Sequence, residues 1–229
     1  MKIRLSLTFL GFLLLTRLLS AETQDVSSCR IVLAPGSKLW LDGDSTIHRY
    51  ESEASVIQID SQVPLNKAVA ESGKTPSVDI LIQSTTVTVF VLTIPVEKMK
   101  SGIVGLASQM HKALKHKAHP NIVFRMRNYQ AHPTQDTEDA ENLYTITVEG
   151  DLTLAGVTNR ISVETLGAIE EDRLHATGQK NLLMSDFGVT PPTLFFGSIK
   201  VANEVNIHWD LNLTLTSERS DTMAPTPLP

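Results

Sequence analysis

The strongest constraint on the fold is a run of strict alternation between apolar and polar residues near the end of the chain. Over residues 205–216, a Val, Ile, Trp or Leu stands at every second position, and Asn, His, Asp or Thr stands between them. Successive side chains of a β-strand point to opposite faces, so this segment is predicted to be a strand with one dry and one wet face. Strands this long and one-sided are typical of an antiparallel sheet wrapped around an interior.

Residues 144–154 carry the same alternation, which only Gly150 interrupts on the apolar face. Further strands are expected in segments bounded by Gly, Asp and Glu turns, at residues 38–42, 45–60, 77–95, 121–132, 160–170 and 173–183. Together these segments give about eight strands, a number that closes into a small barrel able to hold one ligand. The predicted fold is therefore all-β, an antiparallel barrel.

One segment has helical rather than strand periodicity. In residues 103–117, apolar side chains recur at spacings of three and four, beginning with Ile103, Leu106 and Met110. This spacing predicts an amphipathic helix, inserted between strands, that lies across an end or flank of the barrel. Pro120 is expected to stop it.

The two ends of the chain differ in composition from its body. Residues 1–21 combine Lys2 and Arg4 with an apolar run over 5–15 and small residues at Ser20 and Ala21, the pattern of a signal peptide cleaved near Ala21. An uncleaved membrane anchor is the alternative. Residues 22–34 are interpreted as a linker, 35–216 as one barrel domain, and 217–229, which hold three prolines, as a disordered tail. The mature protein is then expected in the bacterial periplasm or outside the cell.

Charge and cysteine content narrow the possible partners. The chain has 20 Lys and Arg against 25 Asp and Glu. Removing residues 1–21 takes away three basic residues and leaves 17 against 25, a net charge of −8. Such a balance repels nucleic acid and anionic membrane surfaces. Cys29 is the only cysteine, so no intramolecular disulfide can form; it is interpreted as a plain linker cysteine, with lipidation as the alternative.

Four motifs, in order along the chain, resemble the YceI family. They are WLDGDSTIH at residues 40–48, AHPNIVF at 118–124, GDLTLAGVT at 150–158 and MSDFGV at 184–189. The resemblance implies an exported, lipocalin-like barrel associated with polyisoprenoid binding. It covers roughly residues 35–216, and the third motif is the most specific.

A closed barrel satisfies its backbone groups around the ring, so its interior can be wholly apolar and can hold an elongated hydrophobic ligand. The family resemblance implies that this ligand is a long lipid, polyisoprenoid or quinone-like. The expected lining residues are apolar members of the strands, with three phenylalanines near a rim: Leu92, Ile122, Phe124, Ile146, Val148, Leu152, Ile207, Trp209 and Leu211, with Phe187, Phe195 and Phe196. The alternative is that these side chains fill a solid core, in which case the protein is an interaction module that presents loops to a partner.

Some residues suggest a catalytic or metal-binding site, but a structural role explains each of them more simply. Ser45 and His48 are three apart, so in a strand they face opposite sides, and a hydrogen-bonded turn is favoured over a nucleophile and base. His111 and His116 are five apart and stand among lysines, which disfavours a metal site. No cofactor is expected, and lipid hydrolysis or isomerisation ranks behind both binding functions.

Overall fold

The computed structural model describes residues 28–65, 76–83, 87–134 and 142–217. These residues form mainly strands: β1 (Ser28–Leu33), β2 (Lys38–Ser45), β3 (Tyr50–Ala54), β4 (Gln58–Pro64), β5 (Val89–Pro95), β6 (Met99–Ser101), β7 (Asn121–Pro133), β8 (Leu143–Leu154), β9 (Val157–Glu170), β10 (Arg173–Leu183), β11 (Thr193–Leu194) and β12 (Ile199–Ser217). The helical elements are α2 (Ile80–Gln83), α3 (Leu106–Ala113) and the short 3-10 turns η1 (Val96–Lys98), η2 (Met184–Phe187) and η3 (Phe195–Gly197).

Eight of the strands close into a ring by antiparallel pairing. The order is β1-β4-β5-β7-β8-β9-β10-β12, and β12 pairs with β1 to complete the circle. In the closing register Ile31 lies opposite Leu215, while Cys29 pairs with both Ser217 and Val63. The predicted all-β, antiparallel barrel of about eight strands is confirmed.

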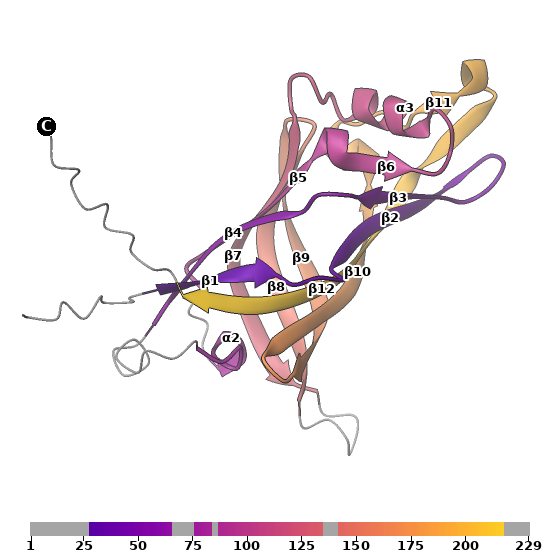
Figure 1. The fold of residues 1–229 in the computed structure, drawn as a ribbon. Coiled ribbons are helices and arrows are strands. Elements are labelled where there is room, and N and C mark those ends of the chain that lie inside the picture. The colour runs from indigo at the N-terminus through magenta and orange to yellow at the C-terminus, as the bar shows by residue number, and fades with distance from the viewer. Residues whose placement is uncertain (1–27, 66–75, 84–86, 135–141, 218–229) are drawn as a thin grey trace, which may run out of the picture.

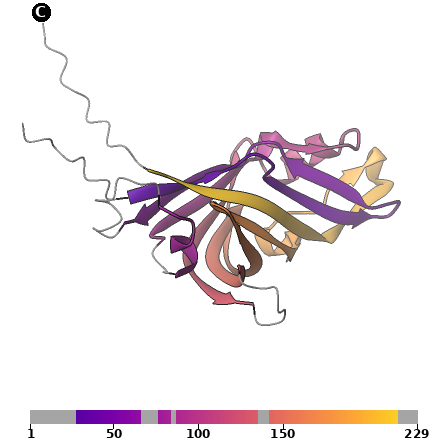
Figure 2. The same ribbon diagram turned by 60° about the horizontal axis from the view of Figure 1, so that its bottom comes forward.

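The long strand β12 carries a second set of strands beside the ring. Its last part pairs with β1, and its middle part pairs with β2, so that β1 and β2 lie end to end along one edge of β12. The sheet then continues through β3 to β6. The wall of the barrel is therefore extended on one side, as Figures 1 and 2 show.

The two alternating segments adopt the predicted faces. In β12 the side chains of Val205, Leu211 and Leu213 are buried, and in β8 Ile146 and Leu152 are buried. Their polar neighbours lie on the outer, wetter side, as the period of two requires.

Helices cover both ends of the barrel. β5 runs from the end covered by α2 to the end covered by α3, and Figure 1 places the two helices at opposite ends. The predicted helix over 103–117 exists but is shorter, since α3 spans only Leu106–Ala113. It ends early because Lys115 takes a left-handed conformation with φ of 53°, well before Pro120.

Three other boundaries differ from the sequence-based prediction. The linker predicted over 22–34 is wrong for Ser28–Leu33, which form β1. Cys29 and Ile31 point inward, but Val32 on the other face is also apolar and half-exposed, so the sequence does not alternate clearly there. The strand predicted over 45–60 is split into β3 and β4.

The strand predicted over 77–95 is also wrong at its start. The apolar run after Asp79 folds into α2, where the Ser77 hydroxyl accepts a hydrogen bond from the Asp79 amide at 3.3 Å.

The proposed signal peptide and most of the proposed tail lie outside the described residues. Within the part of the chain that is described, no helix is long and apolar enough to cross a membrane.

Candidate functional site

A cavity of about 330 Å³ lies inside the barrel. Its walls come mainly from β5, β7, β8, β9, β10 and β12. Side chains of α2 and α3, including Leu81, Leu106 and Met110, also line it. Nearly all of its lining is hydrocarbon. The interior is thus a lumen rather than a core filled by side chains, and its volume falls at the lower end of the range of about 300–1,000 Å³ for small-ligand pockets.

Ten of the twelve predicted lining residues line this lumen: Leu92, Ile122, Phe124, Ile146, Val148, Leu152, Phe187, Ile207, Trp209 and Leu211. The side chain of Phe195 lies outside what the structure describes. The prediction for Phe196 is wrong: its side chain is fully exposed on η3, where the backbone turns with φ of 57°. That the ten residues contact a lipid remains a prediction.

Two glycines allow large rings to lie flat along the lumen wall. A Cβ on Gly150 would lie 2.4 Å from a ring carbon of Phe124, and one on Gly178 would lie 2.3 Å from a ring carbon of Trp209. Gly150, which interrupts the apolar alternation of β8, therefore has a packing role: its missing side chain leaves room for Phe124. Gly178 lies opposite Trp209 in the β10–β12 register and does the same for the indole.

Most of the lining residues were not among those predicted from the sequence. Leu39 and Leu41 come from β2, whose short alternation was recognised only as a strand, and Met184 comes from η2. Thr165 on β9 and Lys180 on β10 are polar. Both lie at inward-facing positions of their strands. They could have been predicted only by continuing the alternation of inward and outward positions along each strand, whether or not the inward residue is apolar.

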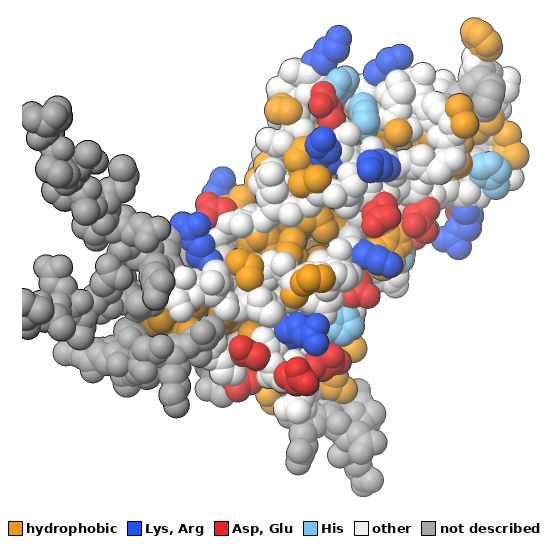
Figure 3. Space-filling model, in the orientation of Figure 1, with side chains coloured by type: hydrophobic (Ala, Val, Ile, Leu, Met, Phe, Trp, Pro, Cys, Tyr) orange, Lys and Arg blue, Asp and Glu red, His pale blue; other side chains and the backbone are white. Residues whose placement is uncertain are grey.

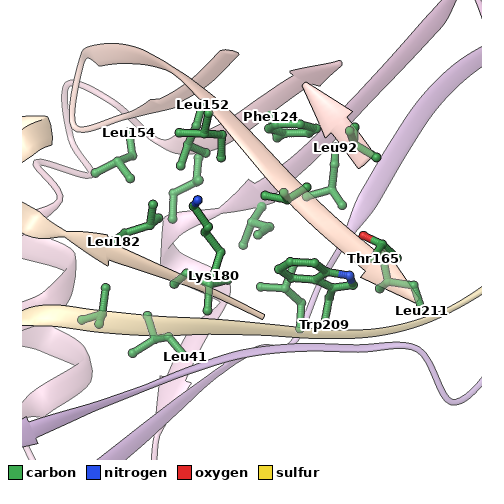
Figure 4. A pocket seen from close by; sticks show the side chains of 18 of the residues that line it. Leu41, Leu92, Phe124, Leu152, Leu154, Thr165, Lys180, Leu182, Trp209 and Leu211 are labelled. Atoms are coloured by element: carbon green, nitrogen blue, oxygen red, sulfur yellow. The ribbon is translucent and has the colours of Figure 1, made fainter. Parts of the chain in front are cut away.

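Lys180 is the only charged side chain among the described residues that line the lumen. Figure 4 shows its amine directed into the cavity among Leu152, Leu154 and Leu182. The Thr165 hydroxyl faces the same space. Every other direction in the lumen offers mainly hydrocarbon, so a bound molecule would be held chiefly by apolar contact.

Tyr50 is a lumen residue whose ionisation is perturbed. Burial, with the nearby charges of Asp42 and Asp44 as smaller causes, raises the pKa of Tyr50 to about 12. The phenol therefore stays neutral at physiological pH and adds no charge to the cavity.

The residues that invited a catalytic interpretation are engaged with backbone. The Ser45 hydroxyl donates to the His48 carbonyl at 2.8 Å, and the His48 ring bonds the Arg49 carbonyl at 2.9 Å. The predicted turn is confirmed, although the hydroxyl and the imidazole do not bond each other. His111 and His116 bond the carbonyls of Met99 and His111, each at 3.0 Å. Within the described ranges, no group of three potential ligands is arranged to hold a metal.

The outer face carries several charge pairs. Asp151 accepts a hydrogen bond from Arg127 at 2.7 Å and lies 3.4 Å from Arg160, and the Arg127 bond holds the pKa of the Asp151 carboxyl below its usual range. Trp40 stacks on His208 with ring centroids 5.0 Å apart. On the face shown in Figure 3, acidic and basic side chains are interspersed.

A closed antiparallel barrel around an apolar lumen places the chain among the small barrels with an internal ligand-sized pocket. Residues 50–213 match the model of the YceI-like domain, and the chain belongs to that family. Two of the solved structures that share the fold illustrate its similarity to this chain. One is BcnA of Burkholderia cenocepacia, with a TM-score of 0.54, 17% identity, and coverage of 77% of this chain and 95% of the other.

The second is described as a polyisoprenoid binding domain from Saccharophagus degradans implicated in plant cell wall breakdown. Its TM-score is 0.53 at 12% identity, and the match covers 82% of this chain and 98% of the other. At these identities the likeness concerns the fold. A comparison with curated protein sequences finds no match.

Proposed function

We propose that this protein is a non-enzymatic carrier or scavenger that holds a long apolar lipid, a polyisoprenoid or a quinone-like molecule, in the barrel lumen. The observation that supports this most directly is the cavity itself, which is lined almost entirely by hydrocarbon and bounded by helices at both ends. At about −0.3 kcal/mol per heavy atom, a 40-carbon isoprenoid has a binding ceiling near −12 kcal/mol, which is about nanomolar. Ordering its flexible tail reduces that figure.

Two further observations favour binding over catalysis. The described lining supplies apolar contact surface rather than paired acid and base groups around a reacting atom. Family membership and the fold shared with the Saccharophagus degradans polyisoprenoid binding domain agree with a lipid ligand.

Export is part of the proposal and rests on residues 1–21 alone. Their basic start, apolar run and small residues at Ser20 and Ala21 are the pattern of a secretory signal. We expect the mature chain in the periplasm or the medium, with its first residue near Glu22. Cell fractionation and the mass of the N-terminal peptide test this; an intact N-terminus in the membrane fraction would contradict it.

The two tryptophans of the chain provide a direct binding assay. Trp209 lines the lumen, whereas Trp40 stacks on His208 outside it. A polyprenyl lipid that carries a quencher should therefore reduce the fluorescence of the W40F variant in a saturable way and leave that of the W209F variant nearly unchanged. Saturable quenching of W209F but not of W40F would place the lipid outside the barrel, and quenching of neither would contradict lipid binding.

A pair of phenylalanine substitutions complements this assay. Phe124 faces the lumen and Phe196 is exposed, so Phe124→Asp should abolish uptake of the lipid while Phe196→Asp should leave it unchanged. Circular dichroism establishes that each variant is folded. A folded Phe124→Asp variant that binds as well as the wild type would show that the inner face has been assigned wrongly.

A further inference from the structure

The position of Lys180 in the barrel wall is fixed by strand geometry. On β10 the inward-facing residues are those with even numbers, so Lys180 stands in line with the buried Leu174 and Ala176 and with Leu182. In the β10–β12 register it lies opposite Ile207, which also lines the lumen. Its side chain is partly buried, and its amine points into the cavity (Figure 4).

The wall of the barrel is interrupted next to Lys180. Pairing between β9 and β10 covers six residue pairs and ends at Gly178 opposite Thr165. Beyond this point β10 continues to pair with β12 up to Leu183, while β9 continues with β8 to Val157. The two strands therefore separate and leave a gap in the hydrogen-bonded wall, which we call the β9–β10 seam.

A hollow of about 400 Å³ lies at the seam, and its lining overlaps that of the lumen. Four residues line both spaces, so the hollow and the lumen adjoin at this point: Ile161, Lys180, Leu182 and Leu183. The rest of the hollow is polar and includes Arg160, Asp186 and Glu204. Lys180 is thus placed at the boundary between an apolar interior and a polar exterior.

Lys180 forms no salt bridge within the described part of the chain, although two carboxylates line the hollow beside it. Asp186 and Glu204 line the outer hollow, but neither lies within the 4.0 Å that would make a salt bridge with Lys180. The other cation of the hollow, Arg160, is engaged by Asp151 at 3.4 Å. Burying an amine in an apolar cavity is costly unless it is paired, so an anionic group on a bound molecule would stabilise the Lys180 ammonium.

We propose that Lys180 selects lipids with an anionic oxygen head group, a phosphate or a carboxylate, and fixes their orientation. The head group lies at the β9–β10 seam against the ammonium, and the hydrocarbon tail extends into the lumen. A charge-assisted hydrogen bond of this kind is roughly twice as strong as a neutral one, so a lipid alcohol with the same tail should bind more weakly. This inference rests on the proposed lipid-binding function and adds the class of head group.

The test compares three ligands with one tail: farnesyl phosphate, farnesoic acid and farnesol. Their dissociation constants are measured for the wild type, for Lys180→Met, which keeps most of the side-chain length without the charge, and for Lys100→Met as a matched control. Lys100 lies on β6 next to Met99. Met99 faces the lumen, whereas Lys100 is exposed and does not line it. We expect the wild type and the control to bind at least one anion about tenfold more tightly than farnesol. Lys180→Met should lose that preference and keep its affinity for farnesol.

The possible results separate the ligand sources and the two proposals. A preference for farnesyl phosphate alone identifies a phosphate site, and a preference for both anions identifies a general anion site. If Lys180→Met retains the wild-type preference, or if the wild type has none, the role of Lys180 is refuted while lipid binding stands. If none of the three ligands binds to the wild type, nor a polyprenyl lipid of longer tail, both proposals fall.

Discussion

Replacing Gly178 by alanine places a methyl group where the ring of Trp209 now lies. Its Cβ would be 2.3 and 2.6 Å from two carbons of the indole and 2.8 Å from the carbonyl oxygen of Glu164. Non-bonded carbon atoms are comfortable at about 3.5–4.0 Å, so the overlap exceeds about 1 Å. The ring must leave the lumen wall, or β9 and β10 must separate at their last paired residues.

Overpacking of this kind costs about 1–3 kcal/mol, and the lower backbone entropy of alanine in the unfolded chain recovers only about 0.4–1 kcal/mol of it. We therefore expect Gly178→Ala to lower the free energy of unfolding by about 1–2 kcal/mol. Equilibrium urea unfolding followed by circular dichroism measures this difference. In a W40F background, the emission of Trp209 should shift as well.

The matched control is Gly102→Ala, because a Cβ at Gly102 would meet no atom of the described residues within 4 Å. Its unfolding midpoint should stay within experimental error of the wild type or rise slightly. Combining Gly178→Ala with Trp209→Leu should recover part of the loss, because the clash is then removed. If Gly178→Ala unfolds at the wild-type midpoint, Trp209 does not lie across β10 and the description of the lumen wall is wrong.

Three further predictions concern buried side chains. Cys29 is buried and burial raises the pKa of its thiol, so a thiol reagent should modify it only as fast as β1 opens; rapid reaction of the native protein would contradict its place in the barrel. The pKa of Tyr50 is raised to about 12, so the folded state favours the neutral phenol. The free energy of unfolding should therefore fall as pH rises from about 10 to about 12, by roughly 2–3 kcal/mol, and Tyr50→Phe should lose this component in alkaline urea titrations. The buried Ser52 hydroxyl has no hydrogen-bond partner among the residues that the structure describes, so Ser52→Ala should raise the free energy of unfolding by about 1 kcal/mol; a loss of stability in urea would reveal an unseen partner.

Period-two alternation was enough to predict the barrel and part of the lining of its lumen. In residues 144–154 and 205–216, each inward side chain follows from the pleat once one strand is recognised, which is why Ile146, Trp209 and Leu211 were correctly placed. The same rule fails where apolar residues occupy both faces, as Ile31 and Val32 do in β1. It also says nothing about turns, so the exposed position of Phe196 on η3 could not be predicted.

Lys180 was missed for a different reason. A lysine inside a strand is normally assigned to the solvent-exposed face. The preceding inward position of β10 is Gly178, so no apolar side chain there indicates that Lys180 also faces inward. Only the register that sets Gly178 against Trp209 and Lys180 against Ile207 shows which way the amine points. The end of β9–β10 pairing at Thr165 is likewise a tertiary feature, because both strands continue in sequence beyond it.

The central claim is that the lumen carries a lipid, and mass spectrometry of the mature protein tests it most directly. The protein is purified gently from its native compartment and measured under native and then denaturing conditions. The lumen predicts a stoichiometric extra mass that is released on denaturation and fragments as an isoprenoid or quinone. A bare protein mass, with no uptake after incubation with quinones or polyprenyl lipids, would contradict lipid carriage.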